Sequence, residues 1–538
     1  MASGHIHTTL KTEIERKMAV LQKGNSIYPF WGENVNLITG LDPLGLQVTS
    51  EATYATMLPG LSNLTNRMRY YGFYCWLLDF YFTREREGNQ TEQNRFIRRA
   101  ELLIALLMQT ERKNINQITG SLFASNLIEN ETSEIFDLAT GADKDSGSER
   151  TYWKYPSGAF GQYYFGALQT LALAVRNEND KGDIIFNITQ PHQRQKVSGK
   201  QLADAFNETL TEDIKSLFYT CIKKGKLSKN DISKLTQYFA IDKISPKSAE
   251  WQLYVDMLLD KDYPSKEIEE EFTFHRKNTI CSLLSTVNKN NQEYNWLAYL
   301  DECYEQKFIN NQTTNIGWYC YQLNEYWQFA CGLIFYGTLC YLESLQAEVY
   351  LPKLITDFSN LIKSELNIEK NITLENCISF NSKGETELLQ EINRNNTPQE
   401  TAKIGFDLLF KLYENNKEQL PQLKEYMSRN GIIRDGNMAD GLLSITNHLQ
   451  ENVNDFISFF IHRNIIYRHQ MVALRKMGSG TQATNKFIIE EQMIRLIDIY
   501  PARWTSPRMN ALRNLLYDLQ VINDEGMITD LQKKIVYQ

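Results

Sequence analysis

The chain has 538 residues, of which 42% are hydrophobic and 23% charged, and its formal net charge is −8. This length exceeds what one hydrophobic core usually supports, and the composition is that of a folded chain, not of a disordered one. The acidic balance excludes a protein that coats nucleic acid or an anionic membrane over its whole surface, so any contact of that kind must be local.

The sequence carries no clear signal for export or membrane insertion. Residues 1–23 lack a continuous apolar run, and the longest uncharged apolar stretch, residues 326–342, is shorter than the roughly 20 residues that span a bilayer. The eight cysteines include no C-x-x-C pair, and a chain of this size needs no disulfides for stability. We expect reduced, buried cysteines, a buried core helix over 326–342, no membrane contact and a cytoplasmic location.

Helical periodicity dominates the chain, because apolar residues recur at three- and four-residue steps in several segments. These segments are 100–107, 203–222, 251–259, 355–366 and 404–412. The best strand candidates are 183–189 and 521–529. The sequence therefore predicts a predominantly α fold, a multi-unit helical protein with minor β structure and a C-terminal winged-helix-like module.

Polar, flexible stretches suggest where the helical units end. The candidate linkers are 139–150, 177–200, 381–399 and 478–484. We interpret the chain as four units. They are an N-terminal helical domain over 1–180, a middle helical domain over 181–390, a third helical unit over 391–480 and a winged-helix-like module over 481–538.

Segment 58–81 contains a Pro-Gly break followed by an aromatic helix. Arg67 and Arg69 are interleaved with the aromatic residues, a pattern with which single-strand binders stack bases. The aromatic residues lie on every face of the helix, however, and burial on all sides produces that distribution. We expect core packing here, and a binding platform is the alternative.

Together with residues 40–47 and 155–164, this segment resembles an uncharacterised bacterial family that is associated with phage-defence gene neighbourhoods. The resemblance implies a role in defence and brings no catalytic residues with it. Gly158, Gly161 and Gly166 do not complete a P-loop, which also needs a lysine followed by serine or threonine. We expect a turn or close helix packing at these glycines.

Three histidines, His448, His462 and His469, are spaced in sevens. On one helix, neighbours would stand about 10.5 Å apart along the axis, too far for one metal ion with bonds of about 2 Å to nitrogen. We therefore expect no metal site, and no other pattern in the chain implies a cofactor.

The same segment carries Arg463, Asn464 and His469, an arginine followed by five residues and a histidine. This pattern resembles the motif of HEPN-type helical ribonucleases. The resemblance implies metal-independent cleavage, in which His469 moves the proton of the ribose 2′-hydroxyl, Arg463 stabilises the phosphorane charge and Asn464 orients the group. The competing interpretation is a structural basic helix.

The C-terminal segment suggests a small module. Residues 488–500 show an apolar periodicity that we interpret as a helix, and a cap followed by proline at 505–507 predicts the start of a second helix. A tight turn at 523–526 then joins two short strands. Helix, turn, helix and wing resemble a winged-helix module.

Residues 461–513 hold nine lysines and arginines against three acidic residues, a local charge of +6. Basic side chains and one tyrosine of this region are the predicted contacts to phosphates and bases. They are Arg475, Lys476, Lys486, Arg503, Arg508, Arg513 and Tyr517. Binding of DNA, binding of RNA and docking to another protein all stay open for this face.

The preferred hypothesis is a non-enzymatic adaptor subunit of a prokaryotic anti-phage defence system that recognises DNA or RNA through its C-terminal module. Its larger helical units would dock a protein partner such as an ATPase or an effector subunit. The alternatives are a HEPN-like ribonuclease and a pure protein scaffold.

Overall fold

In the computed structural model of this protein, the described residues are 36–37, 40–85, 88–111, 117–130, 133–143, 151–179, 181–193, 195–263, 272–289, 293–309, 312–367, 372–380, 383–477 and 482–532. The expectation about residues 1–23 lies outside them.

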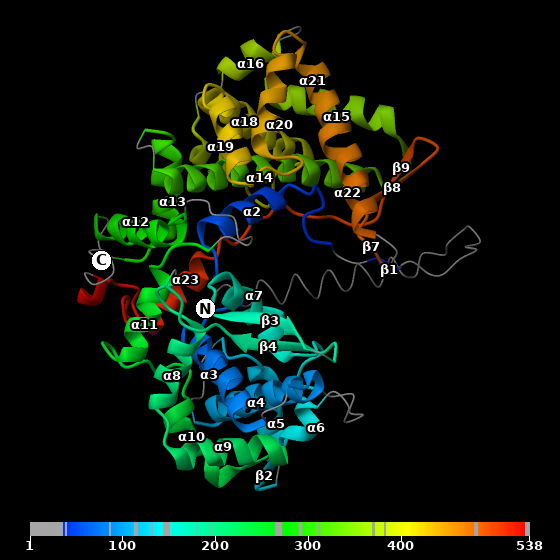
Figure 1. Ribbon diagram of the computed structural model, residues 1–538. Helices are drawn as coiled ribbons and strands as arrows, with labels where there is room; N and C mark the ends of the chain where they lie inside the picture. The colour runs from blue at the N-terminus through cyan, green and yellow to red at the C-terminus, as the bar shows by residue number, and fades with distance from the viewer. Residues whose placement is uncertain are drawn as a thin grey trace.

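Two helical lobes are joined by a middle layer of helices (Figure 1). The helices of the first lobe, at the bottom of Figure 1, are α3 (Arg69–Glu85), α4 (Gln90–Glu111), α5 (Ser121–Asn130), α6 (Leu138–Ala142), η2 (Phe160–Tyr164), α7 (Phe165–Thr170), α8 (Gly199–Glu208), α9 (Glu212–Lys224) and α10 (Lys229–Phe239). The middle layer holds α2 (Gln47–Met57), α11 (Ala249–Leu258), α12 (His275–Lys289), α13 (Trp296–Gln306) and α23 (Met509–Asp518), and η5 (Asp530–Gln532) follows α23.

The second lobe, at the top of Figure 1, is built around the long helix α14 (Thr313–Leu345). Its other helices are α15 (Leu351–Glu365), α16 (Leu374–Phe380), α17 (Glu385–Gln390), α18 (Pro398–Asn416), α19 (Leu420–Arg429), α20 (Met438–Ile445), η3 (Thr446–His448), α21 (Val453–Phe460), η4 (Ile461–Tyr467) and α22 (Arg468–Met477). The predominantly α fold that the sequence predicts is confirmed.

The strands are short and form small sheets at the edges of the lobes. They are β1 (Asn36–Leu37), β2 (Ile135–Asp137), β3 (Ala174–Glu178), β4 (Ile184–Ile188), β5 (Lys226–Ser228), β6 (Val349–Tyr350), β7 (Gln482–Ala483), β8 (Phe487–Glu490) and β9 (Met493–Leu496). β1 pairs with β7 in parallel; the pairs β2–β5 and β3–β4 and the three-stranded sheet β6–β9–β8 are antiparallel. The strand predicted within 183–189 is β4.

Helix α3 lies inside the first lobe. Its aromatic side chains from Tyr70 to Tyr81 are buried on every face, with Trp76 only 1% exposed, and Phe82 is half-buried. The flanking arginines also make internal contacts: Arg69 donates to the Glu250 carboxylate at 3.0 Å, and Arg67 lies 3.4 Å from Asp518. The core packing predicted for this segment is confirmed.

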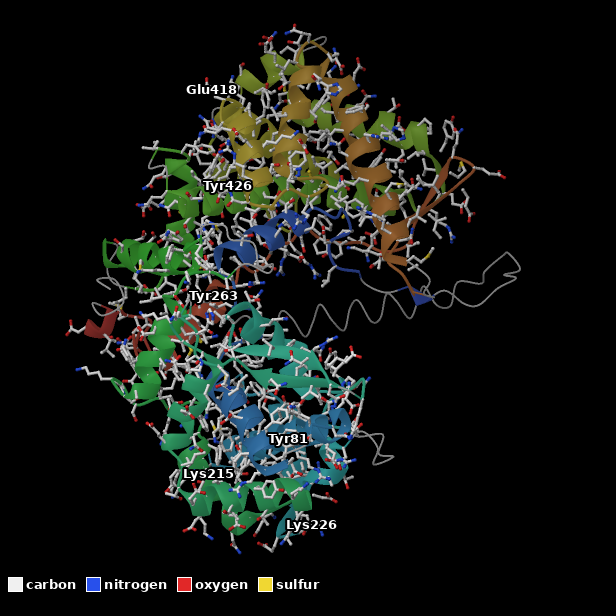
Figure 2. The ribbon with its side chains drawn as sticks, viewed as in Figure 1. Tyr81, Lys215, Lys226, Tyr263, Glu418 and Tyr426 are labelled. Carbon is white, nitrogen blue, oxygen red and sulfur yellow. The ribbon has the colours of Figure 1, made fainter. Side chains whose placement is uncertain are left out.

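Helix α14 carries the apolar stretch 326–342, and α18 and α2 pack along it. In Figure 2, Tyr426 marks the neighbouring helix α19, where its hydroxyl donates to the carbonyl of Thr313 at 2.7 Å. No helix in the described ranges is both long and apolar enough to cross a membrane. All eight cysteines are free thiols and six of them are buried, as expected for reduced cysteines in a helical core.

Residues 488–500 do not form the predicted helix. β8 and β9 make a hairpin there, and its turn is formed by Glu491 and Gln492, whose φ angles are +48° and +68°. The segment is rich in isoleucine, and β-branched residues pack well in strands. The predicted first helix of a winged helix is therefore replaced by a hairpin.

Two other elements of the C-terminal segment agree with the sequence only in part. The predicted second helix is present as α23, but it begins at Met509 with Arg508 as its N-cap, so Pro507 lies before the helix and neither Thr505 nor Ser506 caps it. Ile522 and Ile528 then form an antiparallel bridge around a tight turn, in which the amide of Asn523 donates to the carbonyl of Met527 at 2.9 Å. The tight turn expected at 523–526 is present, but the two short strands predicted beside it are reduced to this single bridge.

One hydrophobic core runs through both lobes, and its buried apolar residues extend from Leu44 to Ile522. The C-terminal segment contributes to it in two places. β9 pairs with β6 of the second lobe, whereas α23 lies in the middle layer, where the Asp518 carboxylate accepts a hydrogen bond from the Met68 amide at 2.8 Å. The described part of 481–538 is therefore shared between two regions of the fold.

Candidate functional site

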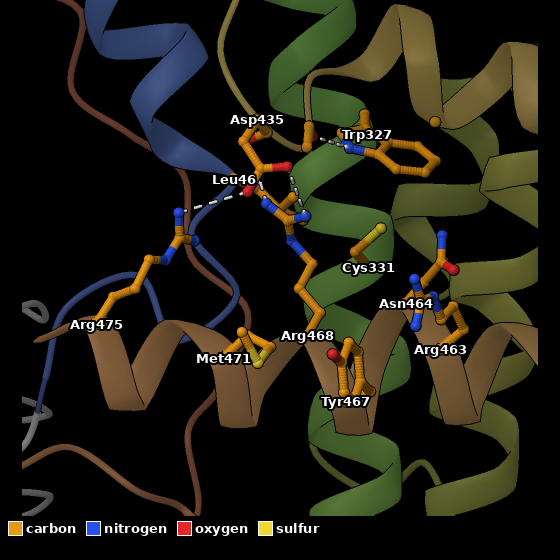
Figure 3. A pocket seen from close by; sticks show the side chains of 12 residues that line it. Leu46, Trp327, Cys331, Asp435, Arg463, Asn464, Tyr467, Arg468, Met471 and Arg475 are labelled. Carbon is orange, nitrogen blue, oxygen red and sulfur yellow. Dashed lines mark hydrogen bonds and ion pairs between the residues drawn. The ribbon is translucent and has the colours of Figure 1, made fainter.

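A pocket of about 360 Å³ lies in the second lobe, along one side of η4 and α22 (Figure 3). Opposite this helical stretch, its walls come from α14, from α20 and the turn before it, and from the residue before α2. The residues that line it are Leu46, Trp327, Cys331, Asp435, Gly436, Gly441, Arg463, Asn464, Tyr467, Arg468, Met471 and Arg475. Three arginines and one aspartate give these lining residues a net charge of +2.

The helical wall of the pocket is irregular, because η4 is a π-helix between two α-helices. An extra residue widens one turn of a helix, and such segments frequently occur at functional sites. Here Ile465 and Ile466 point into the core, while Arg463 and Tyr467 are exposed on the pocket side.

Arg468 is held by backbone carbonyls of two distant loops. Its Nε donates to the carbonyl of Leu44 at 2.6 Å, and its Nη2 donates to those of Gly45 and Asp435 at 3.3 and 3.1 Å. Gly436 makes room for this arrangement, because a Cβ at that position would lie 1.9 Å from Nη2. The guanidinium is thus fixed in place by groups that carry no net charge.

Asp435 is the only acidic residue of the pocket lining. Its carboxylate lies 3.7 Å from Nη1 of Arg468 and 3.5 Å from Nη1 of Arg475. The Asp435 side chain is 69% exposed and that of Arg475 57% exposed, so water screens these ion pairs. Two guanidiniums therefore share one weakly held carboxylate.

The other end of the pocket combines a cation, an amide and an aromatic ring. The Arg463 guanidinium lies 4.7 Å from the centroid of the Tyr467 ring. Asn464 lies beside Arg463 in Figure 3. Between the two ends the wall is apolar, with Trp327 and Cys331 (Figure 3). The indole N–H of Trp327 donates to the carbonyl of Gly436 at 3.2 Å, which connects this wall to the turn that holds Arg468.

His469 does not reach this pocket, although Arg463 and Asn464 do. Its ring is fully buried; Nδ1 donates to the carbonyl of Pro43 at 2.9 Å, and Nε2 accepts from the amide of Lys486 at 2.9 Å. Burial also lowers the pKa of His469 to about 4. The structure therefore does not bring the three residues of the HEPN-like motif together within one chain, and neither ring nitrogen is available to a ribose hydroxyl.

Several basic residues predicted to contact nucleic acid have partners inside the protein. The Lys486 side chain is 1% exposed and lies 2.7 Å from the Asp498 carboxylate. Lys476 donates to the carbonyls of Leu41 and Asp42, and Arg508 donates to that of Leu58 at 3.0 Å. Much of the +6 charge of 461–513 therefore stabilises the fold.

The remaining predicted contacts are dispersed. Arg475 lines the pocket, whereas Arg503 is exposed on the segment before α23, 5.0 Å from the ring centroid of Tyr500. Arg513 and Tyr517 lie on α23 in the middle layer, and the Tyr517 hydroxyl donates to Asp524. The seven residues do not form one continuous patch on one module.

The sequence did not identify the opposite wall of the pocket, which consists of Leu46, Trp327, Cys331, Asp435, Gly436 and Gly441. The Asp-Gly pair at 435–436 is a turn signal, and it predicts a loop without indicating what the loop contacts.

No group of three or more histidines, cysteines or carboxylates that could hold a metal ion occurs in the part of the chain that the structure describes. Comparison with known protein families, curated proteins and solved structures finds no match to this chain.

Proposed function

We propose that this protein is a non-enzymatic, cytoplasmic subunit of a prokaryotic anti-phage defence system that recognises nucleic acid. The observation that carries the proposal is the arginine-lined pocket beside η4 and α22. Its lining residues have a net charge of +2, whereas the whole chain has a net charge of −8. Arginine guanidiniums bind phosphate oxygens in a bidentate manner, and a local cationic site is the kind of contact that an acidic protein can make with nucleic acid.

Exposed apolar side chains on the same helical stretch support this proposal. Tyr467, Met471 and Leu474 are 42%, 42% and 57% exposed. An aromatic ring beside arginines provides a surface on which a base can stack, as in proteins that bind single strands. The defence context rests on the sequence resemblance, and a protein partner such as an ATPase or an effector subunit belongs to the same proposal.

The ribonuclease alternative is less well supported, because both ring nitrogens of His469 are bonded to the backbone. A nucleic-acid-binding protein without this activity should leave RNA intact. A pure scaffold should neither bind nor cleave it.

The test is a binding and cleavage assay with labelled single-stranded RNA and DNA, in EDTA, at low and high salt. Arg463→Ala and Arg475→Ala should each raise Kd about tenfold or more, because a charge-assisted hydrogen bond contributes about 1.5–3 kcal/mol. Each lost phosphate contact should also reduce the slope of log K against log salt by about 0.7.

The matched control is Arg429→Ala, because Arg429 is 76% exposed, pairs with Glu425 and lies outside the pocket. It should bind like the wild type. Absence of binding by the wild-type protein would favour the scaffold, and RNA cleavage that His469→Ala abolishes without unfolding would favour the ribonuclease.

A further inference from the structure

The pocket has two chemically different ends, which restricts the ligands that fit it. Arg468 and Arg475 converge on Asp435 at one end, whereas Arg463 and Asn464 stand at the other (Figure 3). A volume of about 360 Å³ lies at the lower end of the range of small-molecule sites, about 300–1,000 Å³. Such a hollow suits one compact ligand with an anionic end and a polar, planar end.

The Arg468–Arg475 end is suited to a phosphate group. Arg468 is fixed by three carbonyls before any ligand arrives, so little side-chain entropy is lost when it binds. The exposed carboxylate of Asp435 occupies the place between the guanidiniums that an anion would take. A terminal phosphate has a charge of about −1.5 to −2 at neutral pH and three acceptor oxygens. Once it displaces the Asp435 carboxylate, it faces two guanidiniums with a charge of +2, which match it better than they match the single charge of a phosphodiester.

The Arg463–Asn464 end is suited to a base. Arginine and asparagine are the side chains that pair with base edges in a bidentate manner, and the ring of Tyr467 adds a stacking face. Asn464 precedes Arg468 by four residues in the π-helical stretch, so the two side chains project from neighbouring turns. With the reach of the side chains, their separation is comparable to that between the phosphate and the base of one nucleotide.

We propose that this pocket binds a single nucleotide that carries a terminal phosphate, with the phosphate at Arg468 and Arg475 and the base at Asn464 and Tyr467. The inference rests on the proposed function, since it names the part of a nucleic acid that the site takes. The shared chemistry is a nucleoside monophosphate unit, either free or at the end of a strand.

The first experiment measures the affinity of the full-length protein for an oligonucleotide with a 5′-phosphate, with a 3′-phosphate, or with hydroxyl groups at both ends. A terminal phosphate at the preferred end should lower Kd about tenfold or more. Free AMP, GMP, CMP and UMP are then added as competitors, with the nucleosides and inorganic phosphate alone as controls. Competition by a mononucleotide, but not by the matching nucleoside, is the expected result.

Two variants link the preference to the pocket. Asp435→Asn removes the competing carboxylate while keeping the backbone carbonyl that holds Arg468, so it should raise the affinity for the phosphorylated ligand about three- to tenfold. Arg475→Ala should abolish the preference for a terminal phosphate. Arg429→Ala should leave it unchanged, and a merely structural role of Asp435 would not produce tighter binding.

Equal affinity for phosphorylated and unphosphorylated strands, without competition by mononucleotides, would overturn the inference and leave the proposed function standing. Binding of free mononucleotides without binding of any oligonucleotide would support the inference and remove the proposed function. Binding of both would support both, and the competition constants would then show whether the strand end or the free nucleotide is preferred.

Discussion

At the scale of single residues, His469 connects three segments of the chain. Its ring bridges the carbonyl of Pro43 and the amide of Lys486, and it packs between Phe335 and Phe487 with ring centroids 5.0 Å away on each side. The hydrogen bond to a carbonyl requires a proton on Nδ1, and the bond from an amide requires a lone pair on Nε2. The buried ring is therefore neutral, and protonation would break the contact with Lys486.

This geometry predicts an acid-sensitive contribution of His469 to stability. The ring titrates near pH 6.5 when unfolded and near 4 when folded, so its contribution is fully present above pH 6.5 and is lost as the pH falls towards 4. The difference amounts to up to about 3 kcal/mol. Denaturation curves at pH 7.5 and pH 5 should show that His469→Gln loses about 2–4 kcal/mol at the higher pH and depends less on pH than the wild type.

His462→Gln is the matched control, because His462 is an exposed histidine on the same helical stretch. Its stability should follow that of the wild type at both pH values. Equal stability of His469→Gln and the wild type would contradict the structural role assigned to the buried ring.

At the scale of elements, the hairpin of β8 and β9 is fastened by the ion pair of Lys486 and Asp498. The ammonium lies 5.6 Å from the ring centroid of Tyr500, and the Lys486 carbonyl accepts hydrogen bonds from the amides of Ile497 and Asp498. The Lys486 side chain is 1% exposed and that of Asp498 39% exposed. The two ends of the hairpin are thus held together around a buried cation.

Removal of the acidic partner should cost more than removal of both partners. Asp498→Asn leaves the buried ammonium without its counter-ion, and it should lower the free energy of unfolding by about 1–3 kcal/mol. Lys486→Met should cost less than about 1 kcal/mol, and the double variant should resemble it. Denaturation curves of the three variants provide the measurement.

The Lys486→Met variant also tests whether Lys486 contacts nucleic acid. Because Lys486 is buried, Lys486→Met should bind nucleic acid like the wild type. A loss of affinity as large as that of Arg475→Ala, in a folded Lys486→Met protein, would restore Lys486 to the binding surface.

Elements with one dominant signal were predictable from the sequence, and elements decided by tertiary partners were not. Aromatic residues on every face of 58–81 indicate burial of α3 whatever packs on it. The spacing of the apolar residues in 488–500 fits a helix as well as a hairpin, and the turn at Glu491 and Gln492 has positive φ without the glycine that usually marks such turns. The helix predicted over 488–500 is therefore wrong, and the segment forms the β8–β9 hairpin.

The candidate site was predictable only on one side. Arg463, Asn464 and Arg475 belong to one helical stretch, so their place along one wall of the pocket follows from the sequence. Trp327 and Asp435 reach the same pocket through tertiary packing, which no local pattern encodes. The internal partners of Lys486 and Arg508 are also set by tertiary packing. The number of basic residues in 461–513 therefore overestimates the basic surface.

At the scale of the whole molecule, α23 links the C-terminal segment to the middle layer. Its apolar face is completely buried: Met509, Leu512, Leu515 and Leu516 are each 0% exposed. The hydroxyl of Tyr294 donates to the carbonyl of Met509 at 2.7 Å. Burial of each such side chain contributes about 1.5–3 kcal/mol. The four together contribute a free energy of the same size as the usual net stability of a folded domain, about 5–15 kcal/mol.

Residues 481–538 should be needed for the rest of the chain to fold. A protein that ends at residue 480 would expose the surfaces of the middle layer on which α23 packs, and it should be insoluble or show weakened helical circular dichroism. In the full chain, Leu512→Ala should cost about 2–4 kcal/mol, whereas Asn510→Ala, at an exposed position of the same helix, should cost less than about 1 kcal/mol. Amide hydrogen exchange should show where the fold is loosened. Leu512→Ala should raise exchange in α11, because the indole of Trp251 in that helix donates to the carbonyl of Leu519 at 2.8 Å. A soluble 1–480 protein with native helicity and an unchanged melting temperature would instead show that the C-terminal segment is an independent module, because a core that depends on α23 cannot keep its stability without it.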